Sequence, residues 1–176
     1  MSTLYVDNLV EKSSNHGVHI PGHVIQVVSA TKTDSQANAT QDSFTDITGL
    51  SLSITPNSTN SKIMLLCNIS HSSTQNATGL AFKILRNSTP VGVGSEGSRT
   101  PVSFFGSPIA SDSNMAGTDS WTYLDSPNTT SAITYKVQAS GFNSGLTWYI
   151  NTNFSRNGNI YDDVATSTLT AMEIAQ

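Results

Sequence analysis

The chain has 176 residues, a formal net charge of −4 and only 11% charged residues, against about 25% in ordinary soluble domains. Serine, threonine and asparagine fill 64 positions (27, 22 and 15), and these residues suit turns and strand surfaces better than helix interiors. The five lysines and three arginines are scattered singly and no run approaches the roughly 20 apolar residues of a membrane span, which argues against nucleic acid or a membrane as the partner.

The single cysteine and the first residues of the chain exclude further classes of protein. Cys67 is the only cysteine, which excludes an intramolecular disulfide and a zinc site made of thiolates. It lies inside an apolar run, so we expect a small buried hydrophobe. Residues 1–7 contain neither a basic stretch nor an apolar stretch, so we expect no signal peptide.

Residues 1–22 differ from the rest of the chain and are predicted to form an extended arm. The segment has two short extended pieces around a turn at 13–17, and it ends at Pro21-Gly22. It is too short and too polar to bury a core of its own, so it needs a partner surface or its own symmetry copies. The side chains expected to attach it are Leu4, Tyr5, Val6, Leu9, Val18 and Ile20.

Residues 23–176 are predicted to form one β-sandwich domain, because short apolar runs separated by turn residues recur at regular spacing. No helical period of three turns occurs. We expect strands near 23–31, 44–54, 62–72, 80–87, 90–94, 102–106, 121–125, 132–140, 146–151 and 165–174.

The segment 44–54 has the clearest half-buried pattern near the start of the domain. Leu50, Leu52 and Ile54 alternate with serines, which is the period of a strand with one buried face. A turn cluster follows at 56–60 and leads into 62–72. The two segments are therefore predicted to form a hairpin.

Two strands carry apolar residues on both faces, which indicates a subunit interface. The run 63–67 is apolar throughout, and in 165–174 Leu169 and Ala171 face one way while Met172 and Ile174 face the other. The alternative for the last strand is ordinary core with a β-bulge. The predicted interface residues are Met64, Leu66, Leu169, Met172 and Ile174. Together with the low hydrophobic content and the arm, they predict a homotrimer.

Several segments resemble small virion proteins of tailed bacteriophages, aquatic ones in particular, which are usually described as tail-fibre or structural proteins. The similar segments follow one another in order and cover nearly all of residues 23–176. None of them is a catalytic signature. They are Phe44–Leu50 through Ser61–Ile63, Phe82–Arg86 with Thr89–Gly94, Tyr135–Gln138, and Ser167–Ile174.

The resemblance implies an antiparallel, jelly-roll-like β-sandwich similar to the trimeric heads of tumour necrosis factor and C1q. The arm resembles the extended segments by which fibre subunits join the virion or wind round one another. The family uses such modules at fibre tips, on head fibres and as capsid-decorating cement proteins, so the resemblance leaves the position on the particle open.

The acidic and histidine residues show no catalytic or metal-binding arrangement that outweighs a simpler interpretation. A glycan-cleaving protein needs two carboxylates facing across a groove, and Asp112, Asp119 and Asp125 form the densest acidic group. Asp162-Asp163 could bind calcium with nearby asparagines, and His16, His19 and His23 could bind a metal at a symmetry axis. Solvated turns and contacts of the arm explain both groups more simply. We expect no catalytic residue, no cofactor and no metal site.

The aromatic residues offer a contact surface. Trp148 lies between apolar neighbours and is predicted to be core. Candidates for contact with a receptor are Phe104, Phe105, Trp121 and Tyr123, with core packing as the alternative for each. The loops 94–120 and 141–160 hold Gly, Ser, Asn and aromatic residues and are expected to face outward.

We therefore expect a non-enzymatic bacteriophage structural protein: a trimeric fibre or head-surface protein displayed for attachment to the host. The alternatives are a capsid-decorating protein that stabilises the shell and a soluble sugar-binding or hydrolytic module. The expected partners are other copies of the chain, other virion proteins of the tail, capsid or fibre base, and a host-surface glycan. The expected location is the virion surface, after assembly in the cytoplasm of the host bacterium.

Overall fold

The computed structural model describes residues 10, 20–40, 43–74, 79–106, 115–142, 145–155, 160 and 162–176. Within them the chain is all-β, and no helix there could cross a membrane. The strands are β1 (Val24–Lys32), β2 (Gln36–Asn38), β3 (Thr45–Ile54), β4 (Lys62–Ser73), β5 (Leu80–Arg86), β6 (Thr89–Val91), β7 (Phe104–Phe105), β8 (Gly117–Asp125), β9 (Ile133–Gly141), β10 (Trp148–Ile150) and β11 (Ser167–Ile174).

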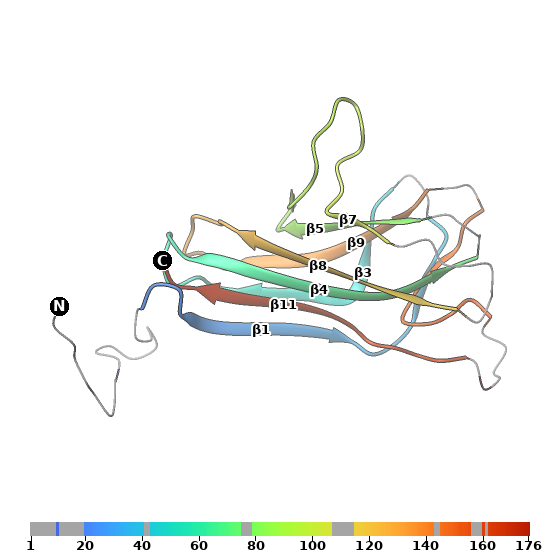
Figure 1. The fold of residues 1–176 in the computed structure, drawn as a ribbon, viewed down its shortest axis with the longest axis horizontal. Helices are drawn as coiled ribbons and strands as arrows, with labels where there is room; N and C mark the ends of the chain where they lie inside the picture. The colour runs from blue at the N-terminus through green and yellow to red at the C-terminus, as the bar shows by residue number, and fades with distance from the viewer. Residues whose placement is uncertain are drawn as a thin grey trace.

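The strands form two antiparallel sheets packed face to face (Figure 1). The six-stranded sheet has the order β1-β11-β4-β10-β2, and β8 pairs with β4 as well. The five-stranded sheet has the order β3-β9-β5-β6, and β7 pairs with β5. The predicted all-β antiparallel sandwich is confirmed.

The core lies between the sheets and is filled by alternate residues of each strand. In β3 the residues Leu50, Leu52 and Ile54 are buried and the serines between them are exposed, as the sequence predicts. Trp148 and Cys67 are also buried in this core. Burial raises the pKa of the Cys67 thiol to about 12, so the residue acts as a small hydrophobe and not as a nucleophile.

The predicted hairpin between 44–54 and 62–72 is wrong. Strand β3 pairs with β9 in the five-stranded sheet, whereas β4 pairs with β11, β8 and β10 in the other sheet. The connection between β3 and β4 therefore crosses from one sheet to the other. Glu173 holds it in place, because its buried carboxylate accepts hydrogen bonds from the Asn57 backbone (2.7 Å) and the Gln26 amide (2.6 Å).

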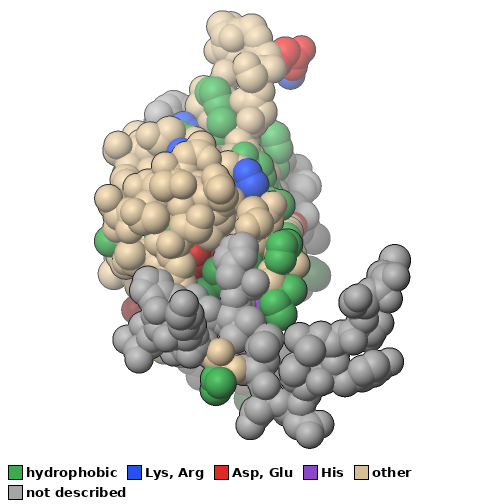
Figure 2. All heavy atoms as spheres, turned by 90° about the vertical axis from the view of Figure 1, so that its left-hand side faces the viewer, with side chains coloured by type: hydrophobic (Ala, Val, Ile, Leu, Met, Phe, Trp, Pro, Cys, Tyr) green, Lys and Arg blue, Asp and Glu red, His purple; other side chains and the backbone are tan. Residues whose placement is uncertain are grey.

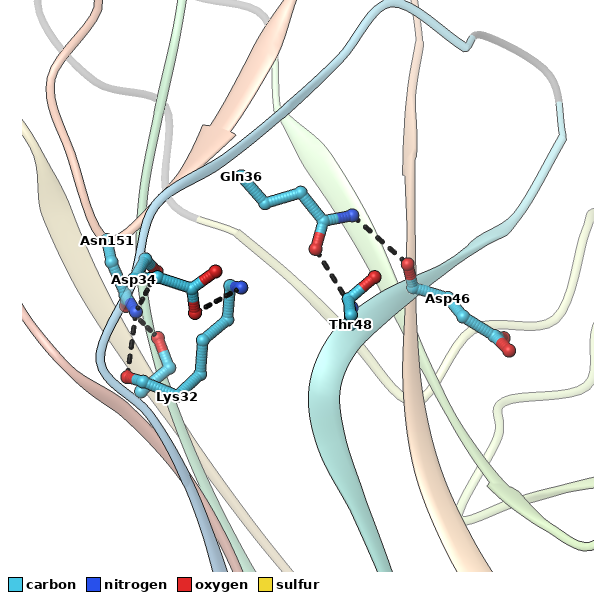
Figure 3. Close-up of polar contacts among 7 residues, drawn as sticks. Lys32, Asp34, Gln36, Asp46, Thr48 and Asn151 are labelled. Carbon is cyan, nitrogen blue, oxygen red and sulfur yellow. Dashed lines mark hydrogen bonds and ion pairs between the residues drawn. The ribbon is translucent and has the colours of Figure 1, made fainter.

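The predicted strand positions agree closely with the structure apart from β2 and the start of β8, which begins at Gly117 and not at residue 121. The short strand β2 is tied to β3 by the Gln36 amide. Its Nε2 donates to the Asp46 carbonyl (3.1 Å), and its Oε1 accepts from the Thr48 N–H (2.8 Å), as Figure 3 shows. This clasp lies where the β3–β9 register shifts, between Asp46 and Ser51.

A buried asparagine joins three strands at the far end of β1. Asn151 has φ +63° and is fully buried. Its Nδ2 donates to the carbonyls of Lys32 (2.8 Å) and Asp34 (3.0 Å), which Figure 3 also shows, and its Oδ1 accepts from Ser167 Oγ (2.6 Å). Its backbone N–H donates to the Ser70 carbonyl (2.9 Å). We call this arrangement the Asn151 junction.

The chain enters and leaves the sandwich at the same end (Figure 1). Gly22 N–H donates to the Ala175 carbonyl (2.8 Å), and Ala175 N–H donates to the His23 carbonyl (2.9 Å). The first strand begins directly afterwards at Val24. Residues 1–9 and 11–19, which make up most of the predicted arm, lie outside the described residues.

Candidate functional site

The outward-facing side chains of β1, β11, β4 and β8 form rows across the six-stranded sheet. Val27 lies opposite Met172, and Met172 lies opposite Met64. Met64 in turn lies opposite Leu124. These four residues, here called the apolar row, make a continuous apolar line across four strands. Val27 is 55% exposed and Leu124 is 47% exposed, so the two ends of the row face solvent in a single subunit.

The rows next to the apolar row become progressively polar. The first of these rows consists of Ser29, Thr170, Leu66 and Thr122. The second consists of Thr31, Thr168, Asn68 and Ser120. A shallow cavity of about 310 Å³ lies over both. A contiguous apolar line bordered by neutral hydrogen-bonding groups is the pattern of an interaction surface, whereas apolar residues that face solvent singly need no explanation.

Four of the five predicted interface residues point outward from this face. Met64 and Met172 belong to the apolar row, Leu66 is 38% exposed, and Ile174 lies half-buried at the end of β11. Leu169 does not: it is fully buried in the core between the sheets, because it has the opposite parity on β11. Its side chain cannot contact a neighbouring subunit in this fold, and we correct that prediction.

Val27 and Leu124, which complete the apolar row, are not recognisable from the sequence alone. Each is a single apolar residue on the outer face of an edge strand, where an isolated apolar residue carries no signal. They acquire significance only through the register, which places both in line with Met64 and Met172.

Stacked aromatic rings fill the seam where the edge strand β8 faces β5 and β7 of the other sheet. Phe82 stacks on Phe104 with ring centroids 4.8 Å apart, and Phe104 stacks on Trp121 at 6.1 Å. Trp121 stacks on Tyr123 at 5.5 Å. This aromatic ladder begins at the fully buried Phe82 and ends at Tyr123, which is 37% exposed.

An ion pair lies beside the exposed end of the aromatic ladder and joins the two sheets. Arg86 Nη1 donates to both carboxylate oxygens of Asp125 (2.9 Å each). The Tyr135 hydroxyl also donates to Asp125 Oδ2 (2.5 Å). Burial, followed by this contact with the carboxylate, raises the pKa of Tyr135 far above its usual range, so the phenol stays protonated and keeps donating.

An open cavity of about 660 Å³ adjoins this ion pair, and we call it the seam pocket. It is bounded by Arg86, Tyr123, Asp125, Ser126 and residues 89–94. Gly92 has φ +59°, and a Cβ there would collide with Trp121. The glycine thus lets the chain pass directly over the aromatic ladder and form one wall of the pocket.

The four predicted receptor-contact residues separate into two groups. Phe104 and Trp121 are half-buried members of the aromatic ladder, and Tyr123 is its exposed end. Phe105 points away from the ladder, is 65% exposed and lies 5.9 Å from the ring of Phe142. The structure therefore brings Tyr123 to the seam pocket, with Trp121 stacked against it outside the pocket lining, and places Phe105 on a different surface.

The loop 92–103 stands out from the body of the sandwich between β6 and β7 (Figure 1) and forms the projection at the top of Figure 2. Residues 94–101 are all exposed. At its base Ser103 Oγ donates to the Val91 carbonyl (2.9 Å) and accepts from the Ile84 N–H (2.9 Å). Part of the predicted outward-facing segment 94–120 is therefore a projecting loop, while its residues 107–114 lie outside the described part of the chain.

The acidic residues considered as catalytic candidates, where the structure describes them, contact other side chains of the sandwich. Asp119 Oδ2 lies 2.6 Å from His71 Nε2, Asp125 is paired with Arg86, and Asp112 lies outside the described residues. Burial lowers the pKa of His71, and Asp119 partly opposes that shift. The sequence around His71 indicates no role for it, because its partner Asp119 is 48 residues away.

The predicted arm and metal residues can be placed only in part. Leu4, Tyr5, Val6, Leu9 and Val18 are outside the described residues, as are His16, His19 and the asparagines near Asp162. Ile20 is half exposed, and its carbonyl accepts a hydrogen bond from the His23 N–H (2.9 Å). Among the residues that the structure describes, no three His, Cys, Asp or Glu side chains gather to hold a metal ion.

Comparison with known proteins gives no relative by sequence: no family model and no curated protein matches the chain. Solved structures of infectious bursal disease virus are similar in backbone arrangement. The structure of the Gt strain covers 89% of this chain and 39% of its own, at 14% identity and a TM-score of 0.45. The VP2 subviral particle covers 86% and 37%, at 13% identity and a TM-score of 0.44. The chain thus spans about two fifths of the length of those proteins, and none of their properties is transferred to it.

Proposed function

We propose that the chain is a non-enzymatic structural protein of a bacteriophage particle, which assembles as a homotrimer and is displayed on the particle surface for attachment to the host. The observation that carries this proposal is the apolar row on the outer face of the six-stranded sheet. The composition and the resemblance to phage virion proteins support it.

The apolar row is suited to contact between copies of the chain. Covering the exposed parts of four such side chains contributes about 1 kcal/mol each, which is a large gain for a small surface. We infer that the row contacts a different patch of the neighbouring copy. Such a contact is heterologous, and a rotation that closes heterologous contacts gives a ring such as a trimer.

The rest of the surface suits display. In Figure 2 most of the coloured surface, which shows the described residues, is backbone or uncharged polar side chains, with few charged groups and with hydrophobic side chains mainly on one side. Neutral hydroxyl and amide groups make wet, individually weak contacts, often through bridging water. Three copies on one particle raise the total strength by avidity, and the projecting loop 92–103 offers each copy an exposed contact segment.

A binding role without catalysis agrees with how the acids are used. The carboxylates of Asp125 and Asp46 each accept hydrogen bonds from a cation and a neutral donor, and Asp119 contacts a buried histidine. Lys136 donates to Asp46 at 2.8 Å, and this contact holds the pKa of Asp46 below its usual range. These carboxylates are engaged in holding the sandwich together.

The assembly is tested by light scattering on the purified full chain, which should give the mass of a trimer. Met172→Glu places a charge in the middle of the apolar row and should yield a monomer with an unchanged circular dichroism spectrum. Ser51→Glu is the matched control: it adds the same charge to the outer face of the other sheet, and it should remain trimeric. A wild-type chain that stays a folded monomer at micromolar concentration would refute the proposed trimer.

The position on the particle is tested by electron microscopy of virions with gold-labelled antibodies against the chain. Label on fibres supports display for attachment. Label spread evenly over the shell, together with shells that lose stability when the protein is missing, supports the capsid-decorating alternative.

The non-enzymatic role is tested by incubating the protein with host surface polysaccharide, which should release no new reducing ends. Hydrolysis by the wild type that is lost in Asp119→Asn or Asp125→Asn would contradict this role.

A further inference from the structure

The seam pocket brings together three kinds of chemical group. An aromatic ring (Tyr123), a guanidinium (Arg86) and a carboxylate (Asp125) all border the same open cavity of about 660 Å³. This volume lies in the range of about 300–1,000 Å³ that small-molecule sites occupy. The pocket lies within one subunit, between the edges of the two sheets, so it does not require the trimer.

The polar side of the pocket is electrically balanced and still has hydrogen-bonding capacity. Nη1 of Arg86 donates to Asp125 and to the Ser126 carbonyl (3.3 Å), while Nη2 and Nε contact no acceptor among the described residues. The Arg86 side chain is 26% exposed, whereas Asp125 is almost fully buried. The pocket therefore offers free N–H donors beside a carboxylate that already neutralises their charge.

This balance selects the class of ligand. An anion would be attracted by Arg86 but repelled by Asp125, and a cation would be attracted by Asp125 but repelled by Arg86. A neutral molecule with neighbouring hydroxyl groups meets no such repulsion. Its oxygens can accept from the guanidinium, and its hydroxyl hydrogens can be donated to backbone carbonyls of the pocket wall.

The apolar side of the pocket suits a ring with C–H groups on its face. Tyr123 borders the cavity and is 37% exposed, and its stacking on Trp121 holds it in place. The face of an aromatic ring is electronegative, so it attracts weakly polarised C–H groups. The glycine at position 92 keeps the chain low over these rings.

We infer that the seam pocket is a binding site for an uncharged saccharide, which packs one face of its ring on Tyr123 and hydrogen-bonds to Arg86. The inference gives the proposed attachment function a ligand class and in that respect rests on it, but the pocket itself is a property of the single subunit.

The test is ligand-observed saturation-transfer NMR with the purified full chain. The probes are the methyl glycosides of glucose, galactose, mannose and N-acetylglucosamine, with sodium glucuronate as a charged probe and glycerol as a polyol without a ring. At least one neutral glycoside should receive saturation, with weaker or no transfer to glucuronate and glycerol. Tyr123→Ala should weaken that binding by about tenfold, which corresponds to about 1.4 kcal/mol.

Two controls keep the test specific. Phe105→Ala removes an exposed aromatic ring that lies outside the seam pocket, so it should leave binding unchanged. Thr89→Trp should block binding by filling the pocket from its rim, because Thr89 is exposed and lies directly opposite Arg86 on the neighbouring strand. Circular dichroism and light scattering of each variant show whether fold and assembly persist.

Several outcomes would overturn the inference. These are no transfer to any neutral glycoside, transfer to glucuronate alone, or binding that survives both Tyr123→Ala and Thr89→Trp. A monomeric chain that still binds a glycoside through Tyr123 would refute the trimer and leave the saccharide site standing. A trimer that binds none of the glycosides would refute the saccharide site and leave the proposed trimer standing.

Discussion

A single side chain supports much of the hydrogen bonding at the Asn151 junction. The amide of Asn151 satisfies two carbonyls at the end of β1 and one serine hydroxyl at the start of β11. Its backbone has a positive φ, which asparagine and glycine tolerate better than other residues. Both the side chain and the backbone conformation therefore explain why asparagine stands here.

Replacing Asn151 should separate these two contributions. Asn151→Gly keeps the left-handed backbone but leaves buried carbonyls without donors, so we expect a loss of about 2–4 kcal/mol in the free energy of unfolding. Asn151→Ala should cost about 1 kcal/mol more because of backbone strain. Asn128→Gly is the control: Asn128 also has a positive φ but is exposed, so its replacement should change stability by less than about 0.5 kcal/mol. Equal effects at the two positions, measured by denaturant unfolding, would contradict this account.

His71 should make stability depend on pH in a defined window. Its Nε2 contacts Asp119, and its buried Nδ1 has no hydrogen-bond partner among the residues that the structure describes. Burial lowers its pKa in the folded chain, so the unfolded chain takes up the proton first on acidification. The stabilising contribution is therefore complete above about pH 6.5 and declines below it, by at most about 1.4 kcal/mol per pH unit.

The measurement is denaturant unfolding at about pH 7.5 and about pH 5.5, above the range where Asp46 begins to take up a proton. The wild type should lose stability between these two values, and His71→Gln should lose clearly less, because glutamine can still donate to Asp119 without titrating. The other histidines are present in both proteins and cancel in the comparison. The same pH dependence in both proteins would rule out His71 as its cause.

At the scale of elements, alternation predicted the strands well but not their partners. The pattern of β3, β9 and β11 identifies which residues face the core, and the structure agrees at Leu50, Leu52 and Ile54. The turn cluster at 56–60 between two strand segments predicts a hairpin of β3 and β4, and strands that follow each other in sequence do pair in about two thirds of cases. The buried Pro56 and the contact of Asn57 with Glu173 direct this connection across the sandwich instead.

The two missed pieces of strand share a physical reason. Strand β2 and the first residues of β8 are polar and lie at the margin of the six-stranded sheet, so neither shows apolar alternation. Strand β2 exists because β10 pairs with it and Gln36 clasps β3. Contacts of that kind join residues far apart in sequence and leave no local pattern.

The candidate sites were predictable to different degrees for the same reason. Parity along one strand identified Met64 and Met172, but only the register between strands adds Val27 and Leu124. The seam pocket is built from the ends of β5 and β8 and from the turn at Gly92. It has no sequence motif, because its parts meet only when the two sheets pack together.

At the scale of the whole molecule, the two ends of the described chain lie together. Gly22 and His23 exchange backbone hydrogen bonds with Ala175, and β1 starts only at Val24. The arm therefore joins the sandwich at one end of the six-stranded sheet and not in the middle of its outer face. The apolar row and an attachment by the arm are thus compatible in one subunit.

The last prediction concerns the arm, residues 1–22. Deleting residues 2–21 removes none of the strands and breaks only the contact between Ile20 and His23 among the described backbone hydrogen bonds. The truncated chain should therefore keep a β-type circular dichroism spectrum and a cooperative thermal transition within a few degrees of the full chain. It should fail to enter particles when it replaces the full protein during phage growth, as measured by immunoblotting of purified virions.

Met172→Glu in the full chain separates attachment by the arm from assembly through the apolar row, because it changes the row while the arm stays intact. Truncated protein found in particles at normal occupancy would show that attachment depends on the sandwich and not on the arm.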